Sequence, residues 1–84
     1  MNSFVEEISW DFEVGRKEGY DYMLYVEDSF DYNYYPVYTN KVDFHKVFKA
    51  YHRVNMQKVI EIYDLAKHKD EQLSAHRVWN PPAE

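Results

Sequence analysis

The sequence contains no cysteine, and only two glycines and three prolines occur among its 84 residues. Without cysteine the chain can form neither a disulfide nor a thiolate metal site. Two glycines give little means of building a loop whose backbone approaches a phosphate. The longest apolar runs are only a few residues, too short for a membrane span. Residues 1–10 carry acids where a signal peptide carries bases. We therefore expect a cytoplasmic protein.

The motifs of common catalytic sites are also missing. The sequence has no nucleophile elbow, no P-loop and no H-E-x-x-H helix. Two pairs lie at helical spacing, Asp64 with His68 and His45 with His52, but each offers two ligands where a structural zinc site needs four. We therefore expect no enzymatic activity, no metal and no cofactor.

Charge is distributed unevenly along the chain, whose net charge is -5. Residues 1–40 hold nine of the fifteen acids, seven of the nine tyrosines and only two bases. Residues 41–84 hold eight bases, six acids and all four histidines. The two parts could pack against each other and partly neutralise their charges. Alternatively, an acidic, tyrosine-rich surface could meet a basic partner, and the surplus of tyrosine favours this second interpretation.

The first part of the chain has the alternation of a β-hairpin. Residues 8–14 and 20–28 both alternate between apolar and polar positions, which is typical of half-buried strands. The five residues between them begin and end with the two glycines, as a hairpin loop would. A competing interpretation is a short helical turn at the start, because Ser3 and Glu6 have the spacing of a capping box.

The remaining elements follow from proline and from helical spacing. A third strand could occupy part of residues 29–39, where Pro36 limits it to an edge or ends it. Residues 41–76 lack glycine and proline and place apolar residues near helical spacing, with a break at 53–57 as an alternative. We predict one α+β domain over residues 1–84. It would consist of a small antiparallel hairpin or three-stranded sheet (residues ~8–38) and one long or bent C-terminal α-helix (~41–76).

The candidate site is an acidic aromatic face on this sheet. Residues 28–38 hold five aromatic rings and two carboxylates without a single base. Spaced carboxylates can imitate the phosphates of a nucleic acid, and tyrosine rings can contact arginine by stacking and cation–π interaction. Strand parity places several acids on one face together with Tyr25. The candidate partner-binding residues are Asp11, Glu13, Asp21, Tyr25, Glu27, Asp28, Asp31, Tyr32, Tyr34 and Tyr35.

Small size, acidity and surplus tyrosine resemble the composition of many phage-encoded inhibitors of host nucleic-acid enzymes, including anti-restriction and anti-CRISPR proteins. This resemblance implies a binding protein that blocks a basic, nucleic-acid-binding partner such as a nuclease or CRISPR effector, in the host cytoplasm if the protein is viral. One alternative is a subunit that self-associates, for example as a homodimer, through exposed tyrosines. Another is a nucleic-acid binder that uses Lys46, Lys49 and Arg53, although the net negative charge disfavours direct binding.

Overall fold

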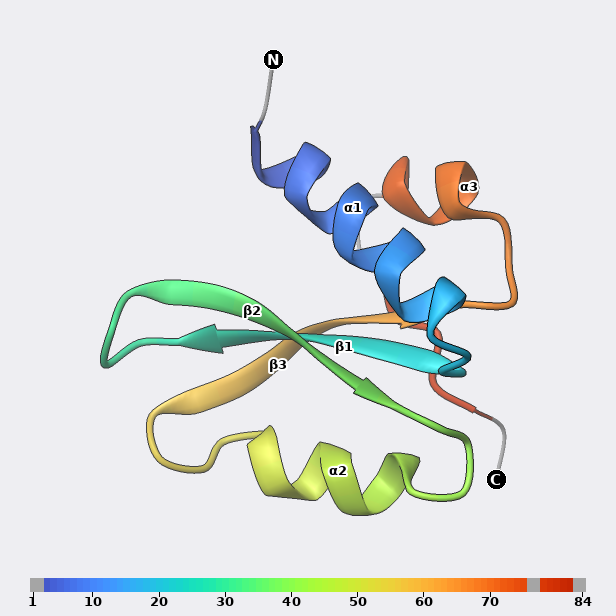
Figure 1. Cartoon of the computed structure of the whole chain (residues 1–84). Coiled ribbons are helices and arrows are strands. Elements are labelled where there is room, and N and C mark those ends of the chain that lie inside the picture. Colours follow the sequence, from blue (N-terminus) through green and yellow to red (C-terminus); the bar gives the residue numbers. More distant parts are fainter. Residues whose placement is uncertain (1–2, 76–77, 83–84) are drawn as a thin grey trace.

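Three antiparallel strands form a sheet that lies between helices on both faces (Figure 1). The structure is a computed structural model and describes residues 3–75 and 78–82. In chain order the elements are α1 (Ser3–Lys17), β1 (Tyr22–Asp28), β2 (Asn33–Thr39), α2 (Phe44–Tyr51), β3 (Gln57–Asp64) and α3 (Lys69–Leu73). The strand order is β2-β1-β3. Helices α1 and α3 cover one face of the sheet, and α2 covers the other (Figure 1).

The central strand β1 contributes to two separate cores. Met23 and Tyr25 point toward α1, where they pack with Ile8 and Phe12 of that helix. The alternate residues of β1 pack with α2 and β3 in a second cluster, formed by Tyr22, Leu24, Val26, Phe44, Val59 and Ile62. Because both faces of β1 are covered, its first five residues are all buried, as in a central strand.

The predicted strand at residues 8–14 is wrong, because this segment lies within helix α1. Ile8 and Phe12 are four residues apart, so a helix places both against the sheet, whereas Trp10 is 72% exposed. The apolar positions of residues 8–14 therefore fit both the period of a strand and the period of a helix. The segment that pairs with β1 in a hairpin is instead Asn33–Thr39, in a register that runs from Tyr22↔Thr39 to Asp28↔Asn33.

The predicted hairpin loop at residues 15–19 is the end of α1. The N–H of Gly19 donates to the carbonyl of Arg16 (3.2 Å), and the N–H of Tyr20 donates to the carbonyl of Gly15 (3.1 Å). These two bonds form a Schellman motif, which requires a left-handed residue at its end. Gly19 has φ +87° and supplies that conformation without a side-chain clash.

The predicted long helix over residues 41–76 is also wrong. The break at 53–57, given above as the alternative, is present, but a strand follows it rather than a second helix. Arg53, Asn55 and Met56 all have positive φ, so the chain leaves the helical path directly after α2. The ring of His52 fixes this turn, because its Nδ1 accepts the N–H of Val59 at 3.2 Å. The α+β content is confirmed, but the order is α-β-β-α-β-α rather than sheet followed by helix.

The C-terminal segment covers part of the outer edge of β3. Ile62 donates its N–H to the carbonyl of Val78 and accepts the N–H of Asn80, at 2.9 and 3.0 Å. The buried side chain of Gln72 ties this region together. Its oxygen accepts the backbone N–H of Asp64 (2.8 Å) and an amide N–H of Asn80 (3.0 Å), and its nitrogen donates to the Asp64 carbonyl (2.8 Å).

Candidate interaction surface at the hairpin tip

The turn between β1 and β2 projects beyond the helices at one end of the molecule (Figure 1). We call residues 27–34 the hairpin tip. The Asp28 carboxylate shapes this turn, because one of its oxygens accepts the N–H groups of Phe30 (2.9 Å) and Asp31 (3.2 Å). Aspartate forms such local bonds readily, and they favour turns over regular structure. Tyr32 then takes a left-handed conformation with φ 55°.

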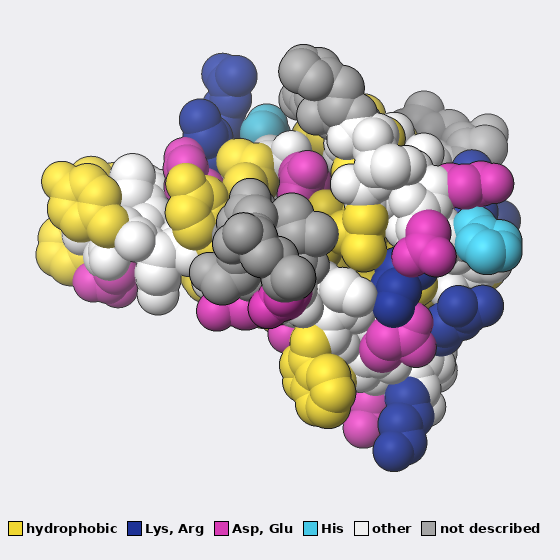
Figure 2. Space-filling model, turned by 90° about the horizontal axis from the view of Figure 1, so that it is seen from above, with side chains coloured by type: hydrophobic (Ala, Val, Ile, Leu, Met, Phe, Trp, Pro, Cys, Tyr) yellow, Lys and Arg dark blue, Asp and Glu magenta, His cyan; other side chains and the backbone are white. Residues whose placement is uncertain are grey.

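Three aromatic rings of the hairpin tip are exposed. Phe30 is 70% exposed, Tyr32 90% and Tyr34 47%. Figure 2 shows hydrophobic side chains with an acidic side chain beside them at this end of the molecule. Large rings gathered in one exposed patch are a common feature of surfaces that contact another molecule.

The acids of the hairpin tip differ in how they are held. Glu27 accepts the hydroxyl of Tyr34 at 3.1 Å and forms an ion pair with Lys58 at 3.5 Å. The Asp31 carboxylate has no hydrogen-bond or ion-pair partner among the described residues. Asp31 therefore presents a full negative charge to solvent, whereas the charge on Glu27 is partly compensated. A pocket of about 290 Å³ lies between the carboxylates and the rings and is lined by Glu27, Asp28, Ser29, Tyr32 and Tyr34.

The loop that precedes β3 supports the hairpin tip. Ser29 donates both its N–H (3.0 Å) and its hydroxyl (2.7 Å) to the carbonyl of Met56. The amide of Gln57 donates to Asp28 at 3.4 Å and to the Tyr35 hydroxyl at 2.6 Å. These hydrogen bonds tie the turn to a second segment of the chain and restrict its conformational freedom.

Five of the ten predicted site residues lie in the hairpin tip, Tyr35 borders it through the amide of Gln57, and the structure does not bring the other four to it. Those gathered in the tip are Glu27, Asp28, Asp31, Tyr32 and Tyr34. Glu13 lies on α1 and forms an ion pair with Lys69 of α3 at 3.2 Å. Asp21 precedes the other end of β1 and accepts the backbone N–H of Lys41 at 2.8 Å. Asp21 and Asp28 are seven positions apart along extended backbone, which is roughly 23 Å.

Tyr25 and Asp11 are internal partners rather than surface residues of one sheet face. Tyr25 is buried beneath α1 and donates its hydroxyl to the Asp11 carboxylate at 3.2 Å. Burial raises the pKa of the Asp11 carboxyl, although the Tyr25 hydrogen bond opposes this shift. Burial and the nearby Asp11 charge raise the pKa of the Tyr25 hydroxyl above its usual range. Tyr35 is half-buried, and its ring meets the edge of Tyr51 at 6.5 Å.

Phe30 and Met56 were absent from the predicted set, yet both are exposed at this end of the molecule. Phe30 shared the spacing of the rings at 32 and 34, so the same alternation could have included it. No local signal identified Met56, because its position beside the tip depends on the pairing of β1 with β3.

Within residues 3–75 and 78–82, no three His, Asp or Glu side chains converge as a metal site would require. The helices of that same part of the chain also lack the combined length and apolar character needed to cross a membrane. The fold and the surface define a small α+β protein with an acidic, aromatic hairpin tip. No protein-family model matches the chain, and no curated protein or solved structure gives a significant match.

Proposed function

We propose that this protein is a small non-enzymatic binding protein that inserts its hairpin tip into a basic surface of a nucleic-acid-handling protein and blocks it. The single observation that carries this proposal is the combination of three exposed rings and the solvent-facing Asp31 carboxylate on a turn held by hydrogen bonds. Rings of this kind stack on arginine side chains, and the carboxylate attracts the cations that otherwise hold phosphates.

The chemistry of the tip favours a basic partner over a second tip. Two identical tips would bring Asp28 and Asp31 of each copy close to the same acids of the other, and like charges at short range oppose association. A basic groove would instead gain attraction during the encounter and lose it as salt is added. Nucleases and CRISPR effectors present such grooves, and the cytoplasm, a host cytoplasm for a viral protein, is where the two would meet.

The acids do not form one line along a sheet face, so the proposed contact is compact. Asp11, Glu13 and Asp21 lie outside the tip and serve internal contacts. We therefore propose that the tip fills a cleft rather than imitating an extended duplex. Because tyrosine is enriched among residues that dominate binding energy, Tyr32 is the proposed anchor of this contact.

The test uses variants that spare the turn. Asp28 is left unchanged, because its carboxylate holds two backbone N–H groups. The tip variant combines Asp31→Lys with Tyr32→Ala, and the control is Glu18→Lys, an exposed acid beyond the end of α1. Affinity capture followed by mass spectrometry identifies the partner, and calorimetry on the purified pair measures the dissociation constant for each variant.

We expect the tip variant to bind at least 30-fold more weakly, which corresponds to about 2 kcal/mol for one hot-spot ring before the charge is counted. Glu18→Lys should bind within twofold of the unaltered protein. The partner's nucleic-acid binding should fall as the unaltered protein is added. A folded tip variant with unchanged affinity, or a tip-dependent partner without a basic surface, would overturn the proposal.

A further inference from the structure

A second surface of opposite charge lies on α2. The sequence has no acid between Asp43 and Glu61, and the exposed Lys46, Lys49 and Arg53 fall within this interval. We call these three residues the basic stripe. Lys46 and Lys49 are three residues apart on one side of α2, and Arg53 follows just beyond the end of that helix. Within the described residues, none of the three has an acidic group within 4.0 Å.

The basic stripe is separated from the acids of α1 by the sheet. Helix α1 lies on one face of the sheet and α2 on the other (Figure 1). Charges further apart than the Debye length, about 8 Å at physiological salt, are largely screened where solvent separates them. The charges nearest to α2 are those of the basic stripe and of Asp43 before the helix, and they contribute most to the field there.

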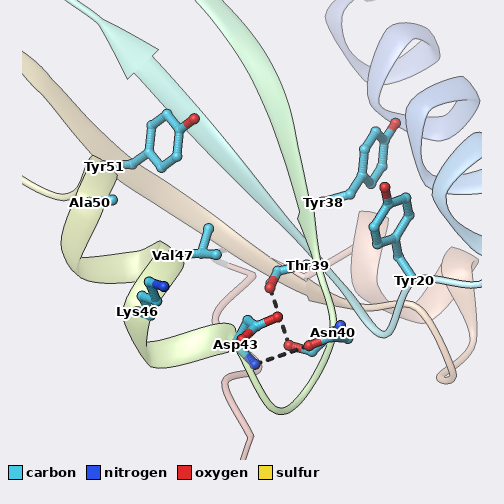
Figure 3. A pocket seen from close by; sticks show the side chains of 9 residues that line it. All are labelled: Tyr20, Tyr38, Thr39, Asn40, Asp43, Lys46, Val47, Ala50 and Tyr51. Carbon is cyan, nitrogen blue, oxygen red and sulfur yellow. Dashed lines mark hydrogen bonds between the residues drawn. The ribbon is translucent and has the colours of Figure 1, made fainter.

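A groove with aromatic walls runs beside the basic stripe. It has a volume of about 380 Å³ and lies between α2 and the end of β2. In Figure 3, Lys46, Val47 and Tyr51 lie along α2, whereas Tyr38 of β2 and Tyr20 lie across the β2 ribbon from that helix. The groove therefore combines a cation with three tyrosines, which come from α2, β2 and the segment before β1.

Tyr20 and Tyr38 form a fixed stacking platform at this groove. Their rings are stacked, with centroids 5.4 Å apart and planes at 20°. The Tyr38 hydroxyl donates to the carbonyl of Asp11 at 2.7 Å, which anchors that ring to α1. Tyr20 rests on this anchored ring and is 43% exposed, so a further flat ring can stack on its open side.

We propose that the groove and the basic stripe bind single-stranded nucleic acid. Lys46, Lys49 and Arg53 contact backbone phosphates, and an unpaired base stacks on Tyr20. A cationic track beside aromatic rings is the arrangement by which proteins bind single strands without reading their sequence. A duplex is disfavoured because its bases are stacked on each other and cannot reach Tyr20. Asp43, a carboxylate that lines the groove, accepts a hydrogen bond from a base amino group.

The groove lies far from the hairpin tip, and the variants used below leave unchanged Arg53, which lies in the loop that bonds the tip through Met56. The groove lies at the end of β2 near Thr39, and the tip lies at the other end of that strand, near Asn33. The two are separated by roughly 20 Å of strand. Loss of one activity therefore leaves the other in place, and variants of each surface serve as controls for the other.

The experiment measures fluorescence anisotropy of a labelled single strand of about 16 nucleotides at low ionic strength, with a duplex of the same length as comparison. The stripe variant is Lys46→Glu with Lys49→Glu. Its matched control is Lys17→Glu with Lys67→Glu, two exposed lysines outside the stripe, which changes the net charge by the same amount. Tyr20→Ala removes the stacking ring, and Tyr20→Phe retains it. Circular dichroism confirms that each variant is folded.

We expect the stripe variant to bind the single strand at least tenfold more weakly than the control pair does. Its slope of log affinity against log salt should be shallower by about 1.4, which is about 0.7 for each phosphate that the variant no longer neutralises. Tyr20→Ala should weaken binding at least fivefold and Tyr20→Phe less than twofold. The tip variant with Asp31→Lys and Tyr32→Ala should still bind the strand.

Three results would overturn this assignment. The first is no binding of the single strand by the unaltered protein at low ionic strength. The second is equal affinity for strand and duplex, or equal weakening by the stripe variant and its control pair. The third is a salt-sensitive oligomer in sedimentation that only the stripe variant abolishes, because the stripe would then bind another copy of the chain.

Discussion

Replacing Gly15 with alanine tests how tightly α1 is seated on the sheet. Gly15 is buried within α1, where a methyl group would lie 2.5 Å from Cε1 and 2.6 Å from Cδ1 of the Tyr38 ring. It would also lie 3.0 Å from Cδ1 of Leu65, a core residue. Carbon atoms do not approach this closely without displacement, so either the Tyr38 ring or the helix must move.

Two opposing effects set the size of the change. Alanine favours a helix over glycine by about 1 kcal/mol. Overpacking of a filled site costs about 1 to 3 kcal/mol, and displacing Tyr38 also breaks its hydrogen bond to the Asp11 carbonyl, which contributes about 1 kcal/mol. We therefore expect Gly15→Ala to lower the free energy of unfolding by about 2 kcal/mol. For a domain of this size, Tm should fall by about 8 to 16 °C.

The assay is urea denaturation followed by circular dichroism, together with a thermal melt. The same substitution is also made in a Tyr38→Val variant, which makes the test specific for Tyr38. Tyr38→Val removes the ring atoms that the new methyl group would meet and leaves only the 3.0 Å contact with Leu65 to oppose a gain of about 1 kcal/mol in helix propensity, so Gly15→Ala should there be close to neutral. A higher Tm for Gly15→Ala in the unaltered protein would refute the close approach of Tyr38. The same destabilisation in both backgrounds would show that Tyr38 is not its cause.

Three further substitutions test internal contacts by urea denaturation. Gln72→Ala leaves buried backbone groups of β3 unpaired and should cost about 2 to 4 kcal/mol; a destabilisation below about 1 kcal/mol would contradict the network. Burial lowers the pKa of His52 below its usual 6.5, so the unfolded chain takes up the proton first and stability should decrease as pH falls below about 6.5. His52→Asn, whose oxygen can still accept the Val59 N–H, should make this decrease smaller; an unchanged pH dependence would contradict the role of His52. Tyr25→Phe removes the hydroxyl bonded to Asp11 and should cost about 1 kcal/mol without altering capture of the proposed partner; failure to capture it would mean that Tyr25 belongs to the site.

The sequence alone predicts those elements whose local pattern fits only one type of secondary structure. The alternation over residues 20–28 predicts a strand, and residues 22–28 of this segment form the central strand β1. Residues 8–14 allowed two solutions, because Ile8 and Phe12 share a face of a helix and also share a face of a strand. The choice between them depended on the partner of β1, which is a long-range pairing that local periodicity does not contain.

The same limit applies to the second half of the chain. Val59, Ile60 and Ile62 are β-branched and favour a strand, yet the absence of glycine and proline made a long helix equally consistent. The chain leaves the helix at Arg53, Asn55 and Met56 through left-handed backbone without glycine, which a rule based on glycine and proline does not detect.

The residues of the candidate site also fall into those that local sequence identifies and those that depend on long-range pairing. Asp31, Tyr32 and Tyr34 were identified because a turn with alternating rings and acids exposes side chains whatever the rest of the chain does. Tyr25 and Asp11 were assigned to the surface because the helix that covers one of them and carries the other had been taken for a strand. The error in the secondary structure of residues 8–14 therefore placed Tyr25 and Asp11 on the surface.

The strand order leaves two outer edges at which a further strand could pair with this sheet. Val78 and Asn80 occupy part of the outer edge of β3, but β2 is the opposite edge of the sheet. Its seven residues carry Pro36 at their centre, and proline has no N–H to offer an incoming strand. A strand that paired with this edge could therefore form an uninterrupted ladder with at most three residues on either side of Pro36.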